Sequence, residues 1–512
     1  MKLMKHGGGW AAIRYTLRMA RKVGWWRLFQ AMRSRNACKT CALGMGGQAG
    51  GMRNEQGHWP EVCKKSLQAM VADMQQGLRP EFFQRYSIAQ LQTLSPRELE
   101  WCGRLTMPLR AGPGDSHYRP IGWDEALARV ADQLRRTRPD ENFFYASGRS
   151  SNEAGFLLQL FARLYGTNFV NNCSYYCHQA SGVGLGAALG TSTATVSLED
   201  IEKADLFLLI GGNPASNHPR LMRTLMNIRR RGGHVIVINP VKEVGLVNFA
   251  VPSDLWSLLF GSKIASLYVQ PHIGGDLALL TGVASSCSAP PTQRSSPRPR
   301  TASTPSSARK CMPPLGTRSS CSVGVEPPRY RQGRGPHCSA KNAAPGWTSG
   351  ITHHEHGVAN VRAIVNPASW RHGRPSPRRS VTDPRPFQCP GDGLRRRRPN
   401  WKQQVLDNLE SYLHVKLPRS PGLDTMACMQ ASERGELRSA FCLGGNLFGS
   451  NPDAKFAQHR ALGRLDLVTY LSTTLNTATP GPRPRDADPA RARHAMRNRK
   501  RPRKNQGSTS SA

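Results

Sequence analysis

Acidic residues are scarce in this chain. Its 512 residues include 71 Lys and Arg but only 33 Asp and Glu, a formal net charge of +38. Such a balance is typical of proteins that bind nucleic acid or an anionic membrane. The shortage is local, however. Residues 1–280 mix acids and bases as an ordinary enzyme does, whereas Glu326 is the only acidic residue from Ser285 to Gly350.

Long apolar runs are also absent. Nowhere do about 18 apolar residues follow one another, and Met1 to Trp26 lacks the continuous apolar stretch of a secretory signal. Thirteen cysteines without such a signal fit a reducing compartment, where paired cysteines hold metals more often than they form disulfides. We therefore expect a cytoplasmic protein with more than one core and no membrane partner.

The middle of the chain alternates strands and helices. Short buried strands are expected at Asn142–Ala146, Ala204–Ile210 and His234–Ile238, with amphipathic helices at Ala154–Tyr165 and Arg220–Arg231. This alternation is typical of a doubly wound parallel sheet, so we expect a multi-lobed α/β protein.

Weaker patterns flank this region. Ile13–Arg35 has the spacing of a basic amphipathic helix, and Asp124 is expected to cap a helix that runs to about Arg136. Toward the C-terminus, a helix is expected at Gln403–Leu413, with strands at Phe441–Leu443 and Leu465–Leu471.

A cysteine beside a histidine marks the candidate site. Cys177 and His178 precede the small residues Gln179-Ala180-Ser181-Gly182, which can open a helix close to a ligand. A helix N-terminus lowers the pKa of a thiol, so Cys177 is suited to metal binding or nucleophilic attack, with His178 as proton acceptor. Packing of both side chains in a core is the other interpretation.

A second group of cysteines lies nearer the N-terminus. Cys38 and Cys41 have the C-x2-C spacing with which two thiolates grip one iron, and Cys63 supplies a third ligand. Cys102 is the candidate for a fourth. From the residues alone, a zinc site completed by His58, or no metal, stays open.

Glycine-rich loops follow the expected strands. In parallel sheets, ligands bind beyond the carboxyl ends of the strands, where loop amides face phosphates. Gly212 and Asn213 follow one strand, Pro240 the next, and Gly445 and Asn446 a later one. A cluster of three histidines, His353, His354 and His356, is spaced too closely to share one face of a helix or strand, so no metal is expected there.

Several of these motifs resemble a known family. The run Tyr176-Cys177-His178-Gln179-Ala180-Ser181-Gly182 looks like the metal-ligand segment of molybdopterin-dependent, formate dehydrogenase-like oxidoreductases. The lead-in Asn171-Asn172-Cys173-Ser174 and the N-terminal cysteines are similar to its FdhF/YdeP-like group. The resemblance implies several α/β lobes like domains 1–3 of formate dehydrogenase and DMSO reductase.

The resemblance also implies roles for the candidate residues. Cys177 would ligate molybdenum held by two molybdopterin guanine dinucleotides, with His178 as its acid/base neighbour. The pterin-contacting residues would be Gly212, Asn213, Pro240, Gly445 and Asn446. An iron–sulfur cluster of the [4Fe–4S] type at Cys38, Cys41 and Cys63 would exchange electrons with a partner protein. The substrate would be a small molecule such as formate.

Two segments and the C-terminal tail break the pattern. Ser285–Trp347 and Pro367–Asn400 are rich in Arg, Pro and Ser, with too little apolar surface to offset chain entropy. A GC-rich gene read in a wrong frame yields this composition. We therefore interpret these segments as frame-shifted and the chain as truncated before a C-terminal domain.

Two alternatives to an active oxidoreductase stay open. One is a basic nucleic-acid-binding protein acting through Arg395–Arg398 and Arg497–Lys504, although no recognised reader motif supports it. The other is an inactive remnant of the oxidoreductase.

These patterns divide the chain into seven segments. They are an iron–sulfur region (1–110), a molybdopterin-binding α/β region (111–284), a disordered or frame-shifted segment (285–349), a strand–helix fragment (350–366), a second such segment (367–400), a pterin-loop α/β region (401–476) and a basic disordered tail (477–512).

Overall fold

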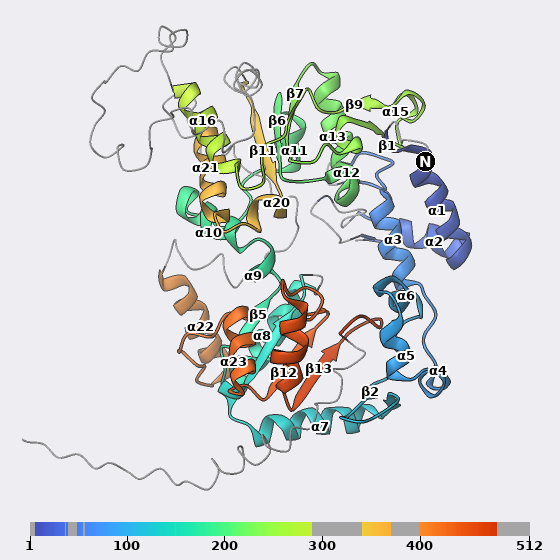
Figure 1. Cartoon of the computed structure of the whole chain (residues 1–512), viewed down its shortest axis with the longest axis vertical. Helices are drawn as coiled ribbons and strands as arrows, with labels where there is room; N and C mark the ends of the chain where they lie inside the picture. The colour runs from blue at the N-terminus through green and yellow to red at the C-terminus, as the bar shows by residue number, and fades with distance from the viewer. Residues whose placement is uncertain are drawn as a thin grey trace, which may run out of the picture. The chain divides into compact units, whose positions relative to one another are not determined.

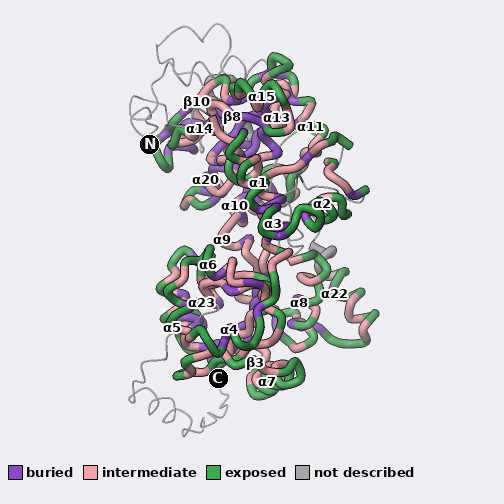
Figure 2. Tube along the Cα trace, turned by 90° about the vertical axis from the view of Figure 1, so that its right-hand side faces the viewer, coloured by how far each residue is buried: buried purple, intermediate pink, exposed green. Residues whose placement is uncertain are grey.

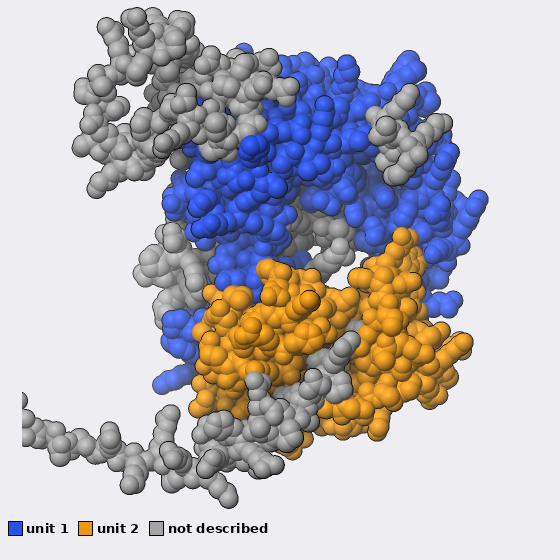
Figure 3. Space-filling view, in the orientation of Figure 1, with its two compact units in different colours: residues 1–76, 146–422 blue, residues 77–145, 423–512 orange. Residues whose placement is uncertain are grey.

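The protein forms two compact units. The computed structural model describes residues 6–35, 37–38, 43, 49–54, 57–148, 150–288, 340–369 and 399–478. Unit 1 combines Met1–Gln76 with Ala146–Gly422, and unit 2 combines Gly77–Tyr145 with Leu423–Ala512 (Figure 3). Both contain parallel strands and helices, which confirms the predicted α/β class. The division into seven segments stays a prediction.

The main sheet of unit 1 is parallel throughout. Its strands lie in the order β10 (Leu267–Val269), β7 (His234–Ile238), β6 (Leu206–Ile210) and β11 (Ala343–Trp347) (Figure 1). All five residues of β6 are buried, as expected for a strand covered on both faces. Figure 2 shows buried residues, in purple, beside α13 (Pro219–Arg230) of the same unit. The strands predicted at 204–210 and 234–238 are thus confirmed.

Helices cover both faces of this sheet. Successive side chains of a strand point to opposite faces, so each strand contributes to two cores. Leu206, Leu208 and Ile210 join a core with α10 (Gln179–Leu189), α16 (Asp276–Ser288) and α21 (Gly357–Ser369). Phe207 and Leu209 join a second core with α13 (Pro219–Arg230). The sheet is doubly wound, as predicted.

The other elements of unit 1 are shorter or lie around this sheet. Strands β1, β8 and β9 form a small sheet in that order. The bounds are β1 Gly7–Gly8, α1 Gly9–Val23, α2 Trp25–Arg33, α3 Lys64–Asp73, α8 Asn152–Tyr165, β5 Val170–Asn172, α9 Ser174–Cys177, α11 Leu198–Glu202, α12 Pro214–Asn217, α14 Val244–Val247, β8 Asn248–Ala250, α15 Leu255–Phe260, β9 Ser262–Lys263, α20 Ser349–Thr352 and α22 Pro399–Leu413.

Unit 2 has a sheet in which β13, β12 and β4 follow one another, with β12 and β13 parallel. A separate core gathers Leu78, Phe83, Leu91, Leu99 and Leu475. The bounds are α4 Pro80–Arg85, α5 Ile88–Thr93, α6 Pro96–Trp101, β2 Leu109–Arg110, β3 Arg119–Pro120, α7 Trp123–Arg136, η1 Pro139–Glu141, β4 Asn142–Ala146, α23 Thr425–Arg434, β12 Ser439–Leu443, η4 Phe456–Ala461, η5 Leu462–Arg464 and β13 Leu467–Leu471.

Two helix predictions need correction. The helix expected over Ile13–Arg35 is two helices, because Gly24 between α1 and α2 adopts φ 91°, a conformation that only glycine adopts readily. The N-cap of α7 is Gly122 and not Asp124. Asp124 lies in the first turn, where its negative charge interacts favourably with the positive end of the helix dipole. None of the described helices is both long and apolar enough to span a bilayer.

The structure also differs from the expectation around residue 345. Ala343–Trp347, at the end of a segment expected to lack order, forms β11 and pairs in parallel with β6. β11 is the last strand in the order of this sheet. Proline has no backbone N–H to donate, and an edge strand tolerates Pro345 because only one side of the strand must form hydrogen bonds to a neighbour. Ile351 and Thr352, expected to start a strand, lie in the short helix α20.

Candidate active site

Cys177 and His178 lie at the junction of two helices of unit 1. Cys177 is the last residue of α9, and His178 separates α9 from α10. The backbone N–H of His178 donates to the carbonyl oxygen of Ser174 at 3.0 Å, and the His178 carbonyl accepts from Ser181 at 3.0 Å. Cys177 is half-buried and His178 is buried. The expected helix opening after Cys177 is confirmed.

The segment that follows β11 contacts this cysteine loop. The Thr352 hydroxyl donates to the carbonyl oxygen of Cys177 at 2.7 Å. The indole N–H of Trp347, fully buried at the end of β11, donates to the hydroxyl of Ser181 at 2.9 Å. Cys177 is therefore held at the carboxyl end of the parallel sheet, where such sheets bind ligands.

Gly212 lies at the same end of the sheet. Gly211 adopts φ 60° directly after β6, and its carbonyl oxygen accepts hydrogen bonds from the Gly350 amide at 3.1 Å and the Thr348 hydroxyl at 2.6 Å. A Cβ atom on Gly212 would lie 2.8 Å from Cγ2 of Thr348. Glycine is thus required where the loops after β6 and β11 meet.

Asn213 and Pro240 follow two neighbouring strands. The side chain of Asn213 caps α12 by accepting the amide N–H of Ser216 at 3.3 Å. Pro240 is exposed after β7, and its carbonyl oxygen accepts Nε2 of Gln270 at 3.0 Å. Because β6 and β7 are parallel neighbours, both residues lie at the same edge as Gly212.

Gly445 and Asn446 belong to unit 2, in the loop after β12. The Asn446 amide is engaged there: Nδ2 donates to Thr477 Oγ1 at 2.6 Å, and Oδ1 accepts the Gly449 N–H at 2.7 Å. The structure thus gives Asn446 a role in shaping its own loop, and its pterin contact stays a prediction.

The described residues include only some of the N-terminal cysteines. Cys38 is buried, and Cys63 caps α3 by accepting the Ser66 N–H at 3.3 Å, whereas Cys41 lies outside the described residues. No group of three His, Cys, Asp or Glu side chains arranged to hold a metal occurs in the described part of the chain. The cluster therefore stays a prediction.

Cys102, the candidate fourth ligand, belongs to unit 2. Its thiol donates to the Glu98 carbonyl oxygen at 3.3 Å, and burial, followed by the Glu98 charge, raises the pKa of the Cys102 thiol. These surroundings favour the thiol over the thiolate that binds metal.

Sequence reasoning did not predict the contacts that hold the cysteine loop in place. Thr352 and Trp347 come about 170 residues after Cys177, and no local pattern links them to it. A buried ion-pair network of Glu61 with Arg220 and Arg223 was likewise unforeseen. Among the described residues, the three histidines form no group that could hold a metal. Burial raises the pKa of the nearby Asp276 carboxyl, and the charge of His354 partly lowers it.

Comparison with known proteins identifies the family. A family model described as molybdopterin oxidoreductase matches residues 104–479, well over half of the chain. The chain belongs to the molybdopterin oxidoreductases. The FdhF/YdeP-like resemblance is confirmed by Protein YdeP of Escherichia coli strain K12, which is 32% identical over 434 residues, 81% of this chain and 57% of YdeP. The chain thus spans little more than half the length of YdeP.

Two further similarities concern the sequence and the fold. The F420-dependent formate dehydrogenase 1 subunit alpha of Methanococcus maripaludis is 36% identical over 172 residues, 33% of this chain and 25% of that subunit. Acetylene hydratase from Pelobacter acetylenicus has a TM-score of 0.52 at 15% identity, covering 82% of this chain and 56% of the hydratase. The latter similarity supports the fold alone.

The family implies a molybdenum–pterin cofactor, and the residues of unit 1 fit one. The thiol of Cys177 is a suitable soft ligand, and Gly212, which has no side chain of its own, packs closely against Thr348 at the same end of the sheet. Several buried polar atoms have no hydrogen-bond partner among the described residues, and they include Nη1 of Arg220, a donor, and Oδ1 of Asn360, an acceptor. Such atoms are expected beside a polar ligand.

Proposed function

We propose that this chain is the core of a bis(molybdopterin guanine dinucleotide) oxidoreductase that exchanges two electrons with a small substrate. The observation that carries the proposal is the hydrogen bond from Thr352 to the Cys177 carbonyl. It joins the cysteine loop to the sheet edge at which Gly212, Asn213 and Pro240 follow their strands. A soft ligand and phosphate-binding loops at one edge are what a dinucleotide-bound metal requires.

Each group of residues in the proposed site would have a separate role. The bound molybdenum would supply two-electron redox chemistry. Cys177 would be its protein ligand, and the loops after β6 and β7 would hold the pterins. His178 is buried beside Cys177 and would accept the substrate proton, because imidazole exchanges protons near neutral pH.

Formate is the substrate we propose. The support is the similarity to a formate dehydrogenase alpha subunit over a third of the chain. Electrons would leave through a [4Fe–4S] cluster at Cys38, Cys41 and Cys63 to a partner protein. A reducing cytoplasm would suit the thiolates of such a chain.

Replacement of the molybdenum ligand tests this proposal. We expect Cys177→Ser to lower formate oxidation at least 100-fold and to remove the cysteine sulfur from the molybdenum X-ray absorption spectrum, because serine is a poor soft ligand. Extracted pterin and molybdenum should be measured in the same preparations.

Cys173→Ser is the matched control. Cys173 lies four residues earlier and its sulfur accepts the Gly148 N–H at 3.0 Å, a local structural contact. We expect this variant to keep the wild-type spectrum and activity. An unchanged spectrum in Cys177→Ser, or the same loss in both variants, would contradict the role of Cys177.

The described residues favour no second function. The basic clusters of the nucleic-acid hypothesis, Arg395–Arg398 and Arg497–Lys504, lie outside the described residues. Nucleic-acid binding therefore has only the net charge to support it.

A further inference from the structure

The short helix α15 of unit 1 turns its apolar residues toward solvent. Its four exposed residues form two pairs at the spacing i, i+4, which places them on one side of the helix. They are Leu255, Trp256, Leu259 and Phe260. Trp256 and Phe260 are 71% and 70% exposed, and their rings stack with 5.6 Å between centroids. Contiguous exposed apolar residues of this kind mark an interaction surface.

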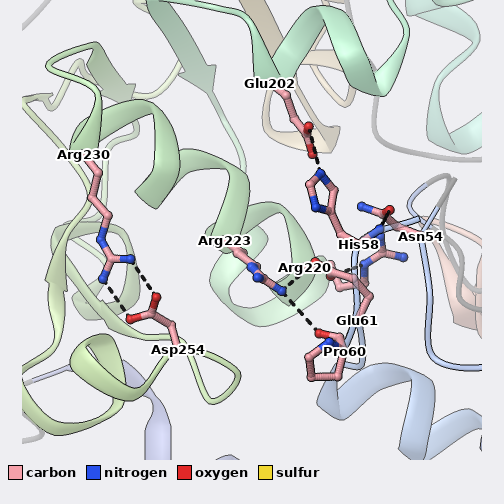
Figure 4. A network of polar contacts seen from close by, with 9 residues as sticks. All are labelled: Asn54, His58, Pro60, Glu61, Glu202, Arg220, Arg223, Arg230 and Asp254. Atoms are coloured by element: carbon pink, nitrogen blue, oxygen red, sulfur yellow. Dashed lines mark hydrogen bonds and ion pairs between the residues drawn. The ribbon is translucent and has the colours of Figure 1, made fainter. Parts of the chain in front are cut away.

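The polar side of α15 faces the protein instead. Ser257 is fully buried, and its hydroxyl oxygen accepts the Val251 N–H at 3.0 Å and donates to the Phe249 carbonyl oxygen at 3.3 Å. Asp254 caps the helix by accepting the Ser257 N–H at 2.8 Å, and Arg230 of α13 holds both oxygens of Asp254 at 2.6 and 2.8 Å (Figure 4). These contacts fix α15 with its apolar side outward.

The basic helix α1 lies beside α15. Strand β1 pairs in parallel with β8, with Gly8 opposite Ala250, so the strand before α1 runs alongside the strand before α15. The two helices are in contact (Figure 1). The outer face of α1, at the spacing i, i+4, i+7 and i+11, consists of four exposed residues: Trp10, Arg14, Leu17 and Arg21. Aromatic and cationic side chains thus adjoin the apolar side of α15.

The N-terminal part of the chain carries positive charge only. No Asp or Glu occurs from Met1 to Asn54. Helices α1 and α2 contain six Lys and Arg, all of them exposed: Arg14, Arg18, Arg21, Lys22, Arg27 and Arg33. The electrostatic complement of this surface is therefore an anionic one.

We propose that α15 and α1 dock unit 1 on the surface of an anionic lipid bilayer. The side chains of α15 enter the boundary between headgroups and acyl chains, where tryptophan is favoured, and the arginines of α1 contact lipid phosphates. A fluid lipid surface requires only an apolar face with positive charge beside it, and the outer side of α15 carries no polar side chain to pair with a protein.

This partner differs from the expectation of no membrane partner. That expectation depended on the lack of long apolar runs, which a helix lying on a bilayer does not need. The inference is independent of the molybdenum site.

Vesicle binding by the full chain tests the inference. The protein is sedimented with vesicles of phosphatidylcholine, alone or mixed with phosphatidylglycerol, at low and high salt. We expect binding to the mixed vesicles to be about tenfold tighter and to weaken with salt, because each Lys or Arg near an anionic surface adds to the attraction. Tryptophan fluorescence should shift to shorter wavelength as the indole rings leave water.

Removal of the apolar side separates α15 from the rest of the surface. We expect Trp256→Ser with Phe260→Ser to weaken binding to the mixed vesicles about tenfold, because two apolar side chains no longer leave water. The matched control is Trp123→Ser with Leu127→Ser, an exposed pair at the same spacing on α7. The control should bind as the wild type does. Because all four side chains are exposed, both variants should keep the wild-type urea midpoint.

Removal of charge gives a second, independent measurement. Arg14→Gln with Arg21→Gln takes two charges from the outer face of α1, and Arg135→Gln with Arg136→Gln takes two from exposed positions of α7. Both variants lower the net charge equally. We expect only the α1 variant to lose affinity and salt dependence on mixed vesicles.

Three results would overturn the inference. A wild-type chain that binds neither kind of vesicle would leave this surface to an acidic protein. Equal losses in the α1, α15 and α7 variants would reduce the binding to an effect of net charge. A wild-type chain that self-associates without lipid, and that Trp256→Ser with Phe260→Ser makes monomeric, would assign the surface to a second copy. The molybdenum content tests the proposed function separately.

Discussion

Asp254 shows how one side chain can serve two parts of a structure. Its carboxylate caps α15 by accepting the Ser257 N–H at 2.8 Å, and it also binds the Arg230 guanidinium through both oxygens. Hydrogen bonding to Arg230 holds the pKa of the Asp254 carboxyl below its usual value, against a smaller opposing effect of burial. The folded protein therefore prefers the charged carboxylate.

This preference makes stability depend on pH. Asp254→Asn keeps a helix cap but loses the ion pair, so we expect it to lower the free energy of unfolding at neutral pH by about 1 kcal/mol. Because the pKa is lower in the folded than in the unfolded state, the wild-type advantage is present above the unfolded pKa. It is lost as the pH falls through the folded pKa.

Urea denaturation from neutral pH to about pH 3 measures this dependence. The difference between wild type and Asp254→Asn should shrink as the pH falls. A difference that stays constant over this range would show that the ion pair does not determine the pKa of Asp254.

At the residue scale, the sequence indicated some candidate residues and missed others. Cys177 and His178 were chosen through the family resemblance, because a thiol beside an imidazole is a weak signal by itself, and their roles stay predictions. Arg220 did not stand out, since an arginine on an amphipathic helix is ordinarily a surface residue. Its burial depends on Glu61, which is 159 residues away.

At the scale of elements, the packing of α10 against α21 supports the site. A Cβ atom on Gly184 of α10 would lie 2.7 Å from Cγ1 of Val361 on α21. The two helices follow the cysteine loop and α20 respectively, so their close approach keeps Thr352 beside Cys177. Glycine at 184 is what permits this approach.

Gly184→Ala tests the close packing. We expect it to lower the free energy of unfolding by about 1–3 kcal/mol, because the added methyl group overfills the contact. Gly155→Ala in α8, where a Cβ atom would meet nothing within 4 Å, should instead raise stability by about 0.5–1 kcal/mol. Chemical denaturation measures both. Equal stabilisation by the two substitutions would mean that α10 and α21 are not in close contact.

Elements with a strong local pattern were predicted well. The strand at Asn142–Ala146 has the bounds expected from periodicity, and α8 ends at Tyr165 as expected. β11 was missed, because Ala343–Trp347 contains alanine, proline and glycine and lacks the β-branched residues typical of strands. Its order comes from pairing with β6 and burial of Trp347, which are tertiary effects.

At the scale of the whole molecule, the high net charge of the chain contrasts with the ordinary composition of its described cores. The two cores are those of an ordinary α/β protein, whereas the basic segments at 289–339, 370–398 and 479–512 lie outside the described residues. The frame-shift hypothesis for these segments therefore stays a prediction that the gene itself can test.

We expect that sequencing the source DNA across codons 280–405 and the 3′ end will reveal a second frame. Because β11 is ordered as the sequence stands, that frame should restore hydrophobic periodicity between residues 288 and 340 and join them in sequence similar to YdeP. The unaltered segments 206–210 and 234–238, translated in the same way, serve as the internal control. Confirmation of the present frame would instead make the charge of +38 a property of the protein.

The sequence by itself determined the α/β class, the parallel order of β6 and β7, and the family. These depend on residue periods and short motifs, which neighbours along the chain create. Only the tertiary structure decided that Thr352 binds the Cys177 loop, that β11 completes the sheet, and that Arg220 is buried on Glu61. Each of these contacts joins residues more than 130 positions apart, and a contact at that distance leaves no periodic trace in the sequence.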